Sequence, residues 1–291
     1  MVEPQVILNG VIAGAAYGLL AISFALLYQV NRFFDLTPAA GCVAGAYATL
    51  LIAKMLQWSI TSALVIGVLA AASLGVLAHL AVLRPLQLKR SGSSEKFLAT
   101  LGLIVVVQSV IAISFGDDTK VLSWHHSNTL EGYGLTVTQP QLAILLVAAV
   151  LLVLAVFAER SYAGRVYRAV AGDEELAQTV GVRVNLVRMA ASACSLAIAG
   201  LAGVLVGADI GLTPGMGFRA ILMGVVAAVI GGIGSFRGVM LGALLIGITQ
   251  NLVAWWISSA WQDAATFVLL IVFLIARPQG ILGRPLRRTS V

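Results

Sequence analysis

The feature that most constrains this chain is a succession of apolar segments, each about as long as a bilayer is thick. A membrane-spanning helix needs about 20 mostly apolar residues, and such runs occupy most of the 291 residues. Only 10% of the residues are charged, against roughly 25% in a soluble domain, and the mean hydropathy is +1.00. We therefore expect an all-α, polytopic transmembrane helical bundle that forms a single domain over residues 1–291.

The apolar segments set the expected number of spans at eight or nine. The last segment is short, and residues 31–41 are interpreted as a break that lies within the membrane. The expected spans are 6–30, 39–57, 60–83, 97–115, 140–158, 189–209, 217–233, 238–257 and 264–276.

Charge in the loops predicts the orientation. Segments 84–96, 159–188 and the C-terminal tail are rich in Arg and Lys, whereas segment 116–139 holds three acidic residues and one Lys. Basic loops tend to stay in the cytoplasm, so 159–188 is expected to be cytoplasmic and 116–139 extracytoplasmic. Nine spans then place the N-terminus outside and the C-terminus in the cytoplasm.

Glycines at four-residue spacing indicate how the helices pack. Such faces let two helix backbones approach closely in lipid, and we expect these contacts within one subunit. The spaced pairs are Gly10/Gly14, Gly14/Gly18, Gly41/Gly45, Gly203/Gly207 and Gly207/Gly211.

The sequence contains no recognisable catalytic constellation, P-loop or metal motif. The Gly-rich stretch 230–238 lacks the lysine of a phosphate-binding loop, so we interpret it as a tight turn between two spans. His79 is expected to be a bonded interior residue, and the adjacent His125 and His126 to be solvated in a loop. We interpret Cys42 and Cys194 as small buried hydrophobic residues.

Neither nucleic-acid binding nor proton coupling is indicated. The high pI of about 9.7 arises from basic loops without interleaved aromatic residues, which a nucleic-acid platform would need. Asp35, Asp209 and Asp263 all fall near span ends. Proton-coupled transporters keep such groups within their spans, whereas sodium coupling through backbone carbonyls would leave no such trace.

The most informative polar stretch is AGDEELAQTVGVRVNLVR, residues 171–188. Asp173 is a predicted N-cap, Glu174 and Glu175 favour the positive end of a helix dipole, and Gly181 is a typical C-terminal stop. The implied helix, 174–180, would place Leu176, Ala177 and Val180 on one face. A helix this short is marginal alone, so it either packs on its own protein or docks in a cytoplasmic partner.

Two similar hexapeptides, LTPAAG at 36–41 and LTPGMG at 212–217, each precede an apolar run. The predicted orientation makes these runs opposite in direction, as expected of an inverted repeat, and transporters built in this way bind substrate at broken helices. One interpretation places Thr37, Pro38, Thr213 and Pro214 in a translocation path. The alternative is that they are ordinary helix starts with proline in the first turn.

Several longer stretches carry a family resemblance that covers nearly the whole chain in order. They resemble the permeases of bacterial ABC importers of the branched-chain amino acid type. The stretches are NGVIAGAAYGLLAI (9–22), RPLQLKRSGSSEKFLATLGL (84–103), GRVYRAVAGDEELAQTVGV (164–182), GGIGSFRGVMLGALLIG (231–247) and RPQGILGRP (277–285).

This resemblance implies a non-catalytic, multi-pass subunit of the bacterial inner membrane that binds no cofactor of its own. Its relatives work with a second, similar permease, two ATPase subunits that use ATP and Mg, and a periplasmic or extracellular substrate-binding protein. The short cytoplasmic helix would couple to an ATPase through Arg168, Asp173, Glu174, Glu175, Leu176, Ala177, Val180 and Gly181. Tyr17, in the opening helix, joins the candidate translocation path.

The chain departs from the family at one place. Many relatives have a motif of the form FAHGE after the first span, where this chain reads FFDLTPAAG. The substrate implied by the resemblance is a branched-chain or related amino acid, but urea and short amides stay open. All are neutral or zwitterionic, which suits spans without central charges. Two other classes also stay open, namely an ion-coupled secondary transporter or channel and a non-transporting membrane-assembly protein.

Overall fold

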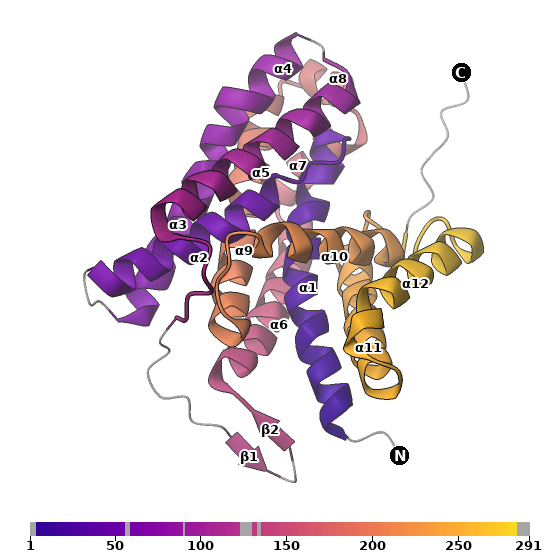
Figure 1. The fold of residues 1–291 in the computed structure, drawn as a ribbon. Coiled ribbons are helices and arrows are strands. Elements are labelled where there is room, and N and C mark those ends of the chain that lie inside the picture. The colour runs from indigo at the N-terminus through magenta and orange to yellow at the C-terminus, as the bar shows by residue number, and fades with distance from the viewer. Residues whose placement is uncertain (1–3, 56–58, 90, 123–129, 133–134, 284–291) are drawn as a thin grey trace.

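The structure is a computed structural model, and it describes residues 4–55, 59–89, 91–122, 130–132 and 135–283. The chain is almost entirely helical (Figure 1). The helices of the first half are α1 (Pro4–Asn31), α2 (Thr37–Met55), α3 (Ile60–Ala78), a π-helical turn (His79–Leu83), α4 (Arg84–Leu88) and α5 (Ser93–Phe115). After the hairpin of β1 (Leu130–Gly132) and β2 (Leu135–Val137) come α6 (Gln139–Arg160), α7 (Tyr162–Gly172), α8 (Glu174–Thr179), α9 (Val184–Ile210), α10 (Met216–Gly231), α11 (Phe236–Trp256), a 3-10 turn (Ser259–Trp261) and α12 (Gln262–Ala276).

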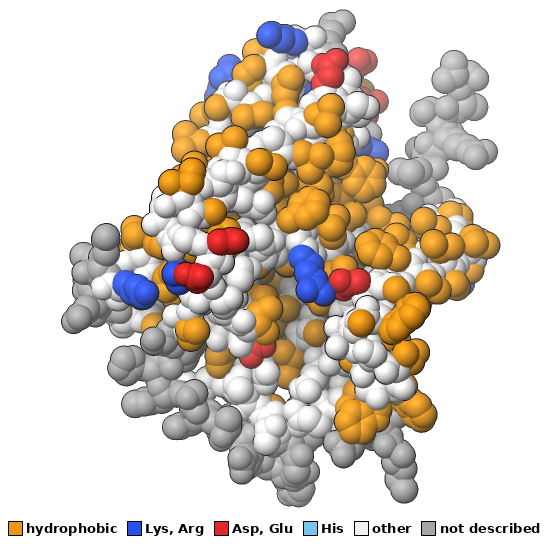
Figure 2. All heavy atoms as spheres, in the orientation of Figure 1, with side chains coloured by type: hydrophobic (Ala, Val, Ile, Leu, Met, Phe, Trp, Pro, Cys, Tyr) orange, Lys and Arg blue, Asp and Glu red, His pale blue; other side chains and the backbone are white. Residues whose placement is uncertain are grey.

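The predicted helical bundle is confirmed. Within the residues that the structure describes, seven helices are long and apolar enough to cross a membrane. Helices α2 and α10, of 19 and 16 residues, occupy the other two expected segments. Helices α4 and α7, the β1–β2 hairpin and the 3-10 turn before α12 were not predicted from the sequence. Figure 2 shows hydrophobic side chains over much of the visible face and several charged ones at the end where α4 and α8 lie.

The hairpin and the start of α1 lie at one end of the bundle, and α4 and α8 lie at the other (Figure 1). At one end, Gln5 bonds to the backbone of Thr136, with both its amide nitrogen and its amide oxygen at 3.0 Å. At the other end, Arg188 reaches Glu174 at 2.6 Å and Gln87 at 3.5 Å. The described residues of the acidic segment 116–139 therefore share an end with the start of α1, and those of the basic segments 84–96 and 159–188 share the other. Which side of the membrane each end faces stays a prediction.

Helix α1 lies at the centre of the bundle and packs against α9, α10 and α11. In its most apolar window 78% of the residues are buried, compared with 11% for α6. The predicted glycine face of α1 is what approaches α11: a Cβ added at Gly10 would lie 2.8 Å from the Ile248 Cα, and one at Gly14 would lie 2.7 Å from the Leu244 Cα. The small residues thus bring two backbones of one subunit together, as expected.

Helix α9 repeats the packing of α1 on the other half of the chain. It packs against α1, α2 and α3, just as α1 packs against α9, α10 and α11. The two helices run in opposite directions, and at their crossing Ser23 and Ser195 each donate to the other's backbone carbonyl, at 2.9 and 2.8 Å. Helices α1–α3 thus correspond to α9–α11, because the first helix of each set packs on all three helices of the other set. This correspondence supports the predicted inverted repeat.

The Gly-rich stretch 230–238 forms the predicted tight turn between α10 and α11. Gly232 has a φ of 94°, and the Ser235 hydroxyl caps α11 by accepting from the Gly238 amide. The segment after α12 packs onto this turn, because Ile281 and Leu282 donate to the carbonyls of Ile230 and Gly231 at 2.9 and 3.1 Å. The Gly-rich turn and the segment after α12, which both belong to stretches that carry the family resemblance, therefore pack against each other.

Some single-residue expectations can be checked. His79 is buried and bonds to Asn185 at 3.0 Å, as expected of an interior histidine. Cys42 is buried, but the same expectation for Cys194 was wrong: it is exposed on α9, because its side of that helix faces away from the neighbouring helices. His125 and His126 lie outside the described residues.

We predict that Gly247→Ala destabilises the bundle. The added methyl would overlap the Gly10 carbonyl oxygen and the Gly14 amide of α1, and overpacking a tight contact costs about 1–3 kcal/mol. The apparent unfolding temperature of the detergent-purified protein should fall. Gly102→Ala is the matched control, because a Cβ at Gly102 on α5 meets nothing within 4 Å; equal unfolding temperatures for the two variants would contradict this account of the contact.

Candidate functional site

The short helix α8 forms where the sequence predicts it. The Asp173 side chain accepts from the Leu176 amide at 3.0 Å, Glu174 and Glu175 occupy the first turn, and Gly181 stops the helix with a φ of 83°. Each residue thus has the local role expected of its type. The helix ends at Thr179, one residue earlier than predicted.

The two sides of α8 face different surroundings. Ala177 is only 2% exposed and packs with Val30, Val170 and Val184. Leu176 and Val180 are 65% and 76% exposed. The expectation that Ala177 shares a face with Leu176 and Val180 was wrong, because the short helix needs one apolar residue to hold it on its own protein. The candidate partner surface is therefore Glu175, Leu176 and Val180.

Polar contacts fix α8 to the rest of the bundle. Glu174 is taken up by its ion pair with Arg188 at 2.6 Å. The guanidinium of Arg32, which follows α1, donates to the carbonyls of Ala171 and Gly172 at the end of α7. The Tyr167 hydroxyl of α7 donates to the Leu26 carbonyl at 2.6 Å, and burial raises the pKa of Tyr167. The segment before α8 is thus tied to the end of α1, and α8 itself is tied to α9.

Arg168, included among the coupling residues, lies on α7 and not beside the exposed face of α8. It lines a polar cavity of about 340 Å³ with Glu159, Arg160, Ser235 and Arg237. The cavity is formed by the end of α6, by α7 and by the start of α11. Arg168 therefore belongs to a separate basic feature of the same end of the molecule.

The stretch LTPAAG begins α2. Thr37 is the first residue of this helix, and its amide and hydroxyl both donate to one oxygen of Asp35, at 3.0 and 2.6 Å. Asn31 donates to the other oxygen at 3.0 Å. Asp35, Thr37 and Pro38 are all buried. These contacts are those of a helix start, which favours the second interpretation of this stretch.

The related stretch LTPGMG precedes α10. Leu212 pairs with Lys120 through backbone bonds of 2.8 and 2.9 Å, and Thr213 and Pro214 form the turn before the helix. Gly217 lies directly against the Ala39 carbonyl oxygen of α2. The two stretches therefore meet in the structure, yet Thr37, Pro38, Thr213 and Pro214 all lie outside the lining of the pocket that contains Tyr17.

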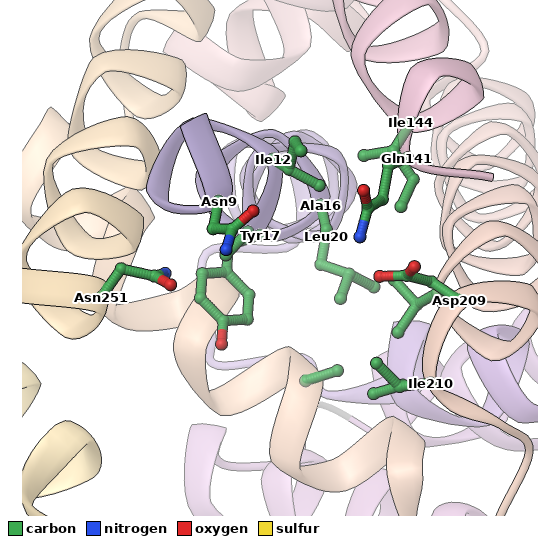
Figure 3. A pocket seen from close by; sticks show the side chains of 13 residues that line it. Asn9, Ile12, Ala16, Tyr17, Leu20, Gln141, Ile144, Asp209, Ile210 and Asn251 are labelled. Atoms are coloured by element: carbon green, nitrogen blue, oxygen red, sulfur yellow. The ribbon is translucent and has the colours of Figure 1, made fainter. Parts of the chain in front are cut away.

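That pocket, of about 270 Å³, is enclosed by α1, α6, α9, α10 and α11 (Figure 3). Its polar side chains are Asn9, Tyr17, Gln141, Asp209 and Asn251. Its apolar lining is Ile12, Ala13, Ala16, Leu20, Ile144, Val206, Ile210 and Ala220. A mostly apolar hollow with a few placed polar groups is the usual form of a small-molecule site.

Of the residues predicted for the translocation path, only Tyr17 lines this pocket. Sequence reasoning missed Asn9, Gln141 and Asn251, and it noted Asp209 only as a residue near a span end. The available signal was weak: each is a single polar residue in or beside an apolar run, and nothing in the sequence shows that four helices bring them together.

The comparisons agree with this class of protein, a polytopic membrane permease. Residues 6–276 match the family described as branched-chain amino acid transport system / permease component. The chain is 29% identical to the high-affinity branched-chain amino acid transport system permease protein LivH of Salmonella typhimurium, over 97% of this chain and 96% of that one. The identity to BraD of Pseudomonas aeruginosa is also 29%, over the same shares of the two chains.

A structural comparison concerns the fold alone. PsaBC from Streptococcus pneumoniae, solved in complex with Fab, has a TM-score of 0.54 and 11% identity over 95% of this chain and 94% of that one. Because the family match spans nearly the whole length, the assignment is clear. The chain belongs to the family of permease components of branched-chain amino acid transport systems.

We predict that Thr37→Val lowers stability while Thr213→Val does not. Thr37→Val removes the 2.6 Å hydrogen bond to the buried Asp35, which costs about 1–3 kcal/mol, whereas no side-chain hydrogen bond of Thr213 is present in the described part of the chain. Apparent unfolding temperatures would show the difference. Two variants with wild-type stability and lost uptake would instead support the translocation-path interpretation.

Proposed function

We propose that this chain is the transmembrane permease subunit of an ABC importer that moves branched-chain or related amino acids into the cell. The observation that carries the proposal is the family match over residues 6–276, joined to a short helix that presents exposed apolar side chains at the basic end of the molecule. The relatives LivH and BraD are named for branched-chain amino acid transport.

The remaining components follow from the same assignment. Two ATPase subunits, using ATP and Mg, would bind the end that carries α8, and this end would face the cytoplasm. A substrate-binding protein would deliver the solute at the end that carries the hairpin. A second permease would complete the path, and LivM of Salmonella typhimurium is 26% identical over 60% of this chain and 42% of its own length. The proposed location is the bacterial cytoplasmic membrane.

Helix α1 would link ATP hydrolysis to transport. Leu176 and Val180 can seat in an apolar groove of an ATPase, while Ala177 keeps α8 on its own subunit. Movement of α8 reaches α1 through the Tyr167–Leu26 and Arg32–Ala171 hydrogen bonds. The same helix carries Asn9 and Tyr17, which line the pocket. The position of α1 would therefore affect both the contacts with α7 and the shape of the pocket.

Urea or short amides are the second candidate substrates. Three of the five polar side chains of the pocket are amides, Asn9, Gln141 and Asn251, and amide groups pair well with urea because each supplies both donors and acceptors. Uptake of labelled urea by the assembled transporter, with no uptake of leucine, isoleucine or valine, would favour this alternative.

We predict that the double change Leu176→Asp, Val180→Asp separates the permease from its ATPases. Two charges would stand where apolar side chains enter the groove, and burying an unpaired charge is costly. ATPase recovered with tagged permease, and ATP-dependent amino acid uptake in proteoliposomes, should both fall about tenfold or more.

Gln178→Ala, on the same helix, is the matched control and should retain both properties. A double variant that still binds ATPase and imports at the wild-type rate would contradict the docking role of α8. Uptake by vesicles that hold the permease without any ATPase would instead indicate an ion-coupled transporter or a channel.

A further inference from the structure

We propose that the pocket between α1, α6, α9, α10 and α11 binds the transported amino acid as a zwitterion. Asp209 would hold the ammonium group, and Tyr17 and Asn9 would hold the carboxylate. The apolar lining would contact the aliphatic side chain. This inference rests on the proposed function and adds the residues that recognise the substrate.

Asp209 is the one carboxylate of the pocket and lies in the last turn of α9, a membrane span. It is half-buried, and its contacts are neutral: the Thr138 hydroxyl at 3.5 Å and the amide of Gln141. In the described part of the chain, every ion pair involves a different carboxylate. Asp209 lies near the end of this span, and unlike Asp35, which caps α2, it accepts no backbone N–H in the described part of the chain. A half-buried carboxylate of this kind that lines a pocket can accept a cationic group. A substrate ammonium supplies the missing positive charge.

The opposite flank of the pocket offers hydrogen-bond donors. Asn9 accepts from Gln5 at 3.0 Å through its oxygen, which leaves its NH2 group for a ligand. The Tyr17 side chain lies next to Asn9 on the same flank of the pocket (Figure 3). Asn251 donates to the Gly247 carbonyl at 3.0 Å, which leaves its oxygen as an acceptor. A phenol and an amide NH2 are suitable donors to a carboxylate.

The two flanks are separated by an apolar floor. In Figure 3, Asn9, Tyr17 and Asn251 lie on one side and Gln141 and Asp209 on the other, with Leu20 between them. Ile144 and Ile210 border the side of Asp209. An α-amino acid carries its ammonium and carboxylate groups on one carbon, so this carbon would lie over Leu20, with the ammonium toward Asp209 and the carboxylate toward Tyr17 and Asn9. Its aliphatic side chain would then contact the apolar lining of the pocket. Urea lacks both the charge and the apolar body.

Asp209→Asn tests the ammonium contact. The whole transporter, with its ATPases, partner permease and leucine-loaded binding protein, is reconstituted in proteoliposomes, and the initial rate of ATP-driven leucine uptake is measured. We expect the rate to fall at least tenfold, because the substrate ammonium would lose its hydrogen-bonded contact with a charged group. Asp209→Glu, which keeps the charge, should recover part of the rate.

Asp118→Asn is the matched control, because Asp118 is a carboxylate of the same end with an almost fully exposed side chain. Uptake by this variant should equal that of the wild type. Asp209→Asn at the wild-type rate would overturn the assignment of Asp209.

A second pair of variants tests whether transport needs the open volume of the pocket, without changing any charge. Ala13→Leu places a large side chain in the pocket and should abolish uptake, whereas Ala149→Leu, at an exposed position of α6, should leave it intact. Basal ATP hydrolysis and the elution volume of the complex should match the wild type in both. Normal uptake by Ala13→Leu would show that the pocket is not on the path.

These outcomes separate the two proposals. If the wild-type transporter imports no branched-chain amino acid, the proposed function fails. If the wild type imports leucine and neither Asp209→Asn nor Ala13→Leu reduces the rate, the function stands and the pocket assignment fails. If the Asp209→Asn transporter does not assemble, the proposal is tested with Tyr17→Phe and Ala13→Leu instead. Leucine uptake at the wild-type rate in both of these variants would overturn the proposal.

Discussion

The backbone contact between α1 and α11 is the constraint on which the rest of the structure depends. Glycines at Gly10, Gly14 and Gly247 let the two helices approach until backbone atoms meet. In lipid the hydrophobic effect does not drive helices together, so close packing of this kind supplies much of the association. With α1 fixed in the centre, α9 and α10 pack on its other sides, and the pocket forms where these helices cannot fill the space between them.

Much of this fold was predictable from the sequence because a membrane limits the alternatives. Apolar length specifies a span, and local chemistry specifies a cap or a turn, so α8 and the turn at Gly232 appeared where Asp173, Gly181 and the Gly-rich stretch indicate them. Helix α7 was missed because its amphipathic pattern lies among basic loop residues. The burial of Ala177 was missed for a different reason: which side of a short helix faces the protein depends on Val30 and Val184, far away in the sequence.

The candidate site was less predictable than the fold. Asp209 is about 200 residues from Asn9 and Tyr17 along the chain, and only the packing of α1 against α9 brings them to one pocket. Conversely, the stretch FFDLTPAAG, where the chain departs from many relatives, is accounted for locally. Asp35 satisfies the start of α2 by accepting from Thr37 and Asn31. Residues that stand out in a sequence can thus serve the backbone, while those that line the pocket look unremarkable in the sequence.

The crossing of α1 and α9 at Ser23 and Ser195 limits how these two helices can move relative to each other. Each hydroxyl bonds to the other helix's carbonyl, in a site that is fully buried. A small slide of α1 along α9 would strand both hydroxyls at once, and unpaired buried polar groups are costly. Tilting of the two helices about this point keeps both hydrogen bonds, whereas sliding of one helix along the other breaks them. A push on α1 from the end that carries α8 would therefore tilt this helix about the serine pair rather than slide it along α9.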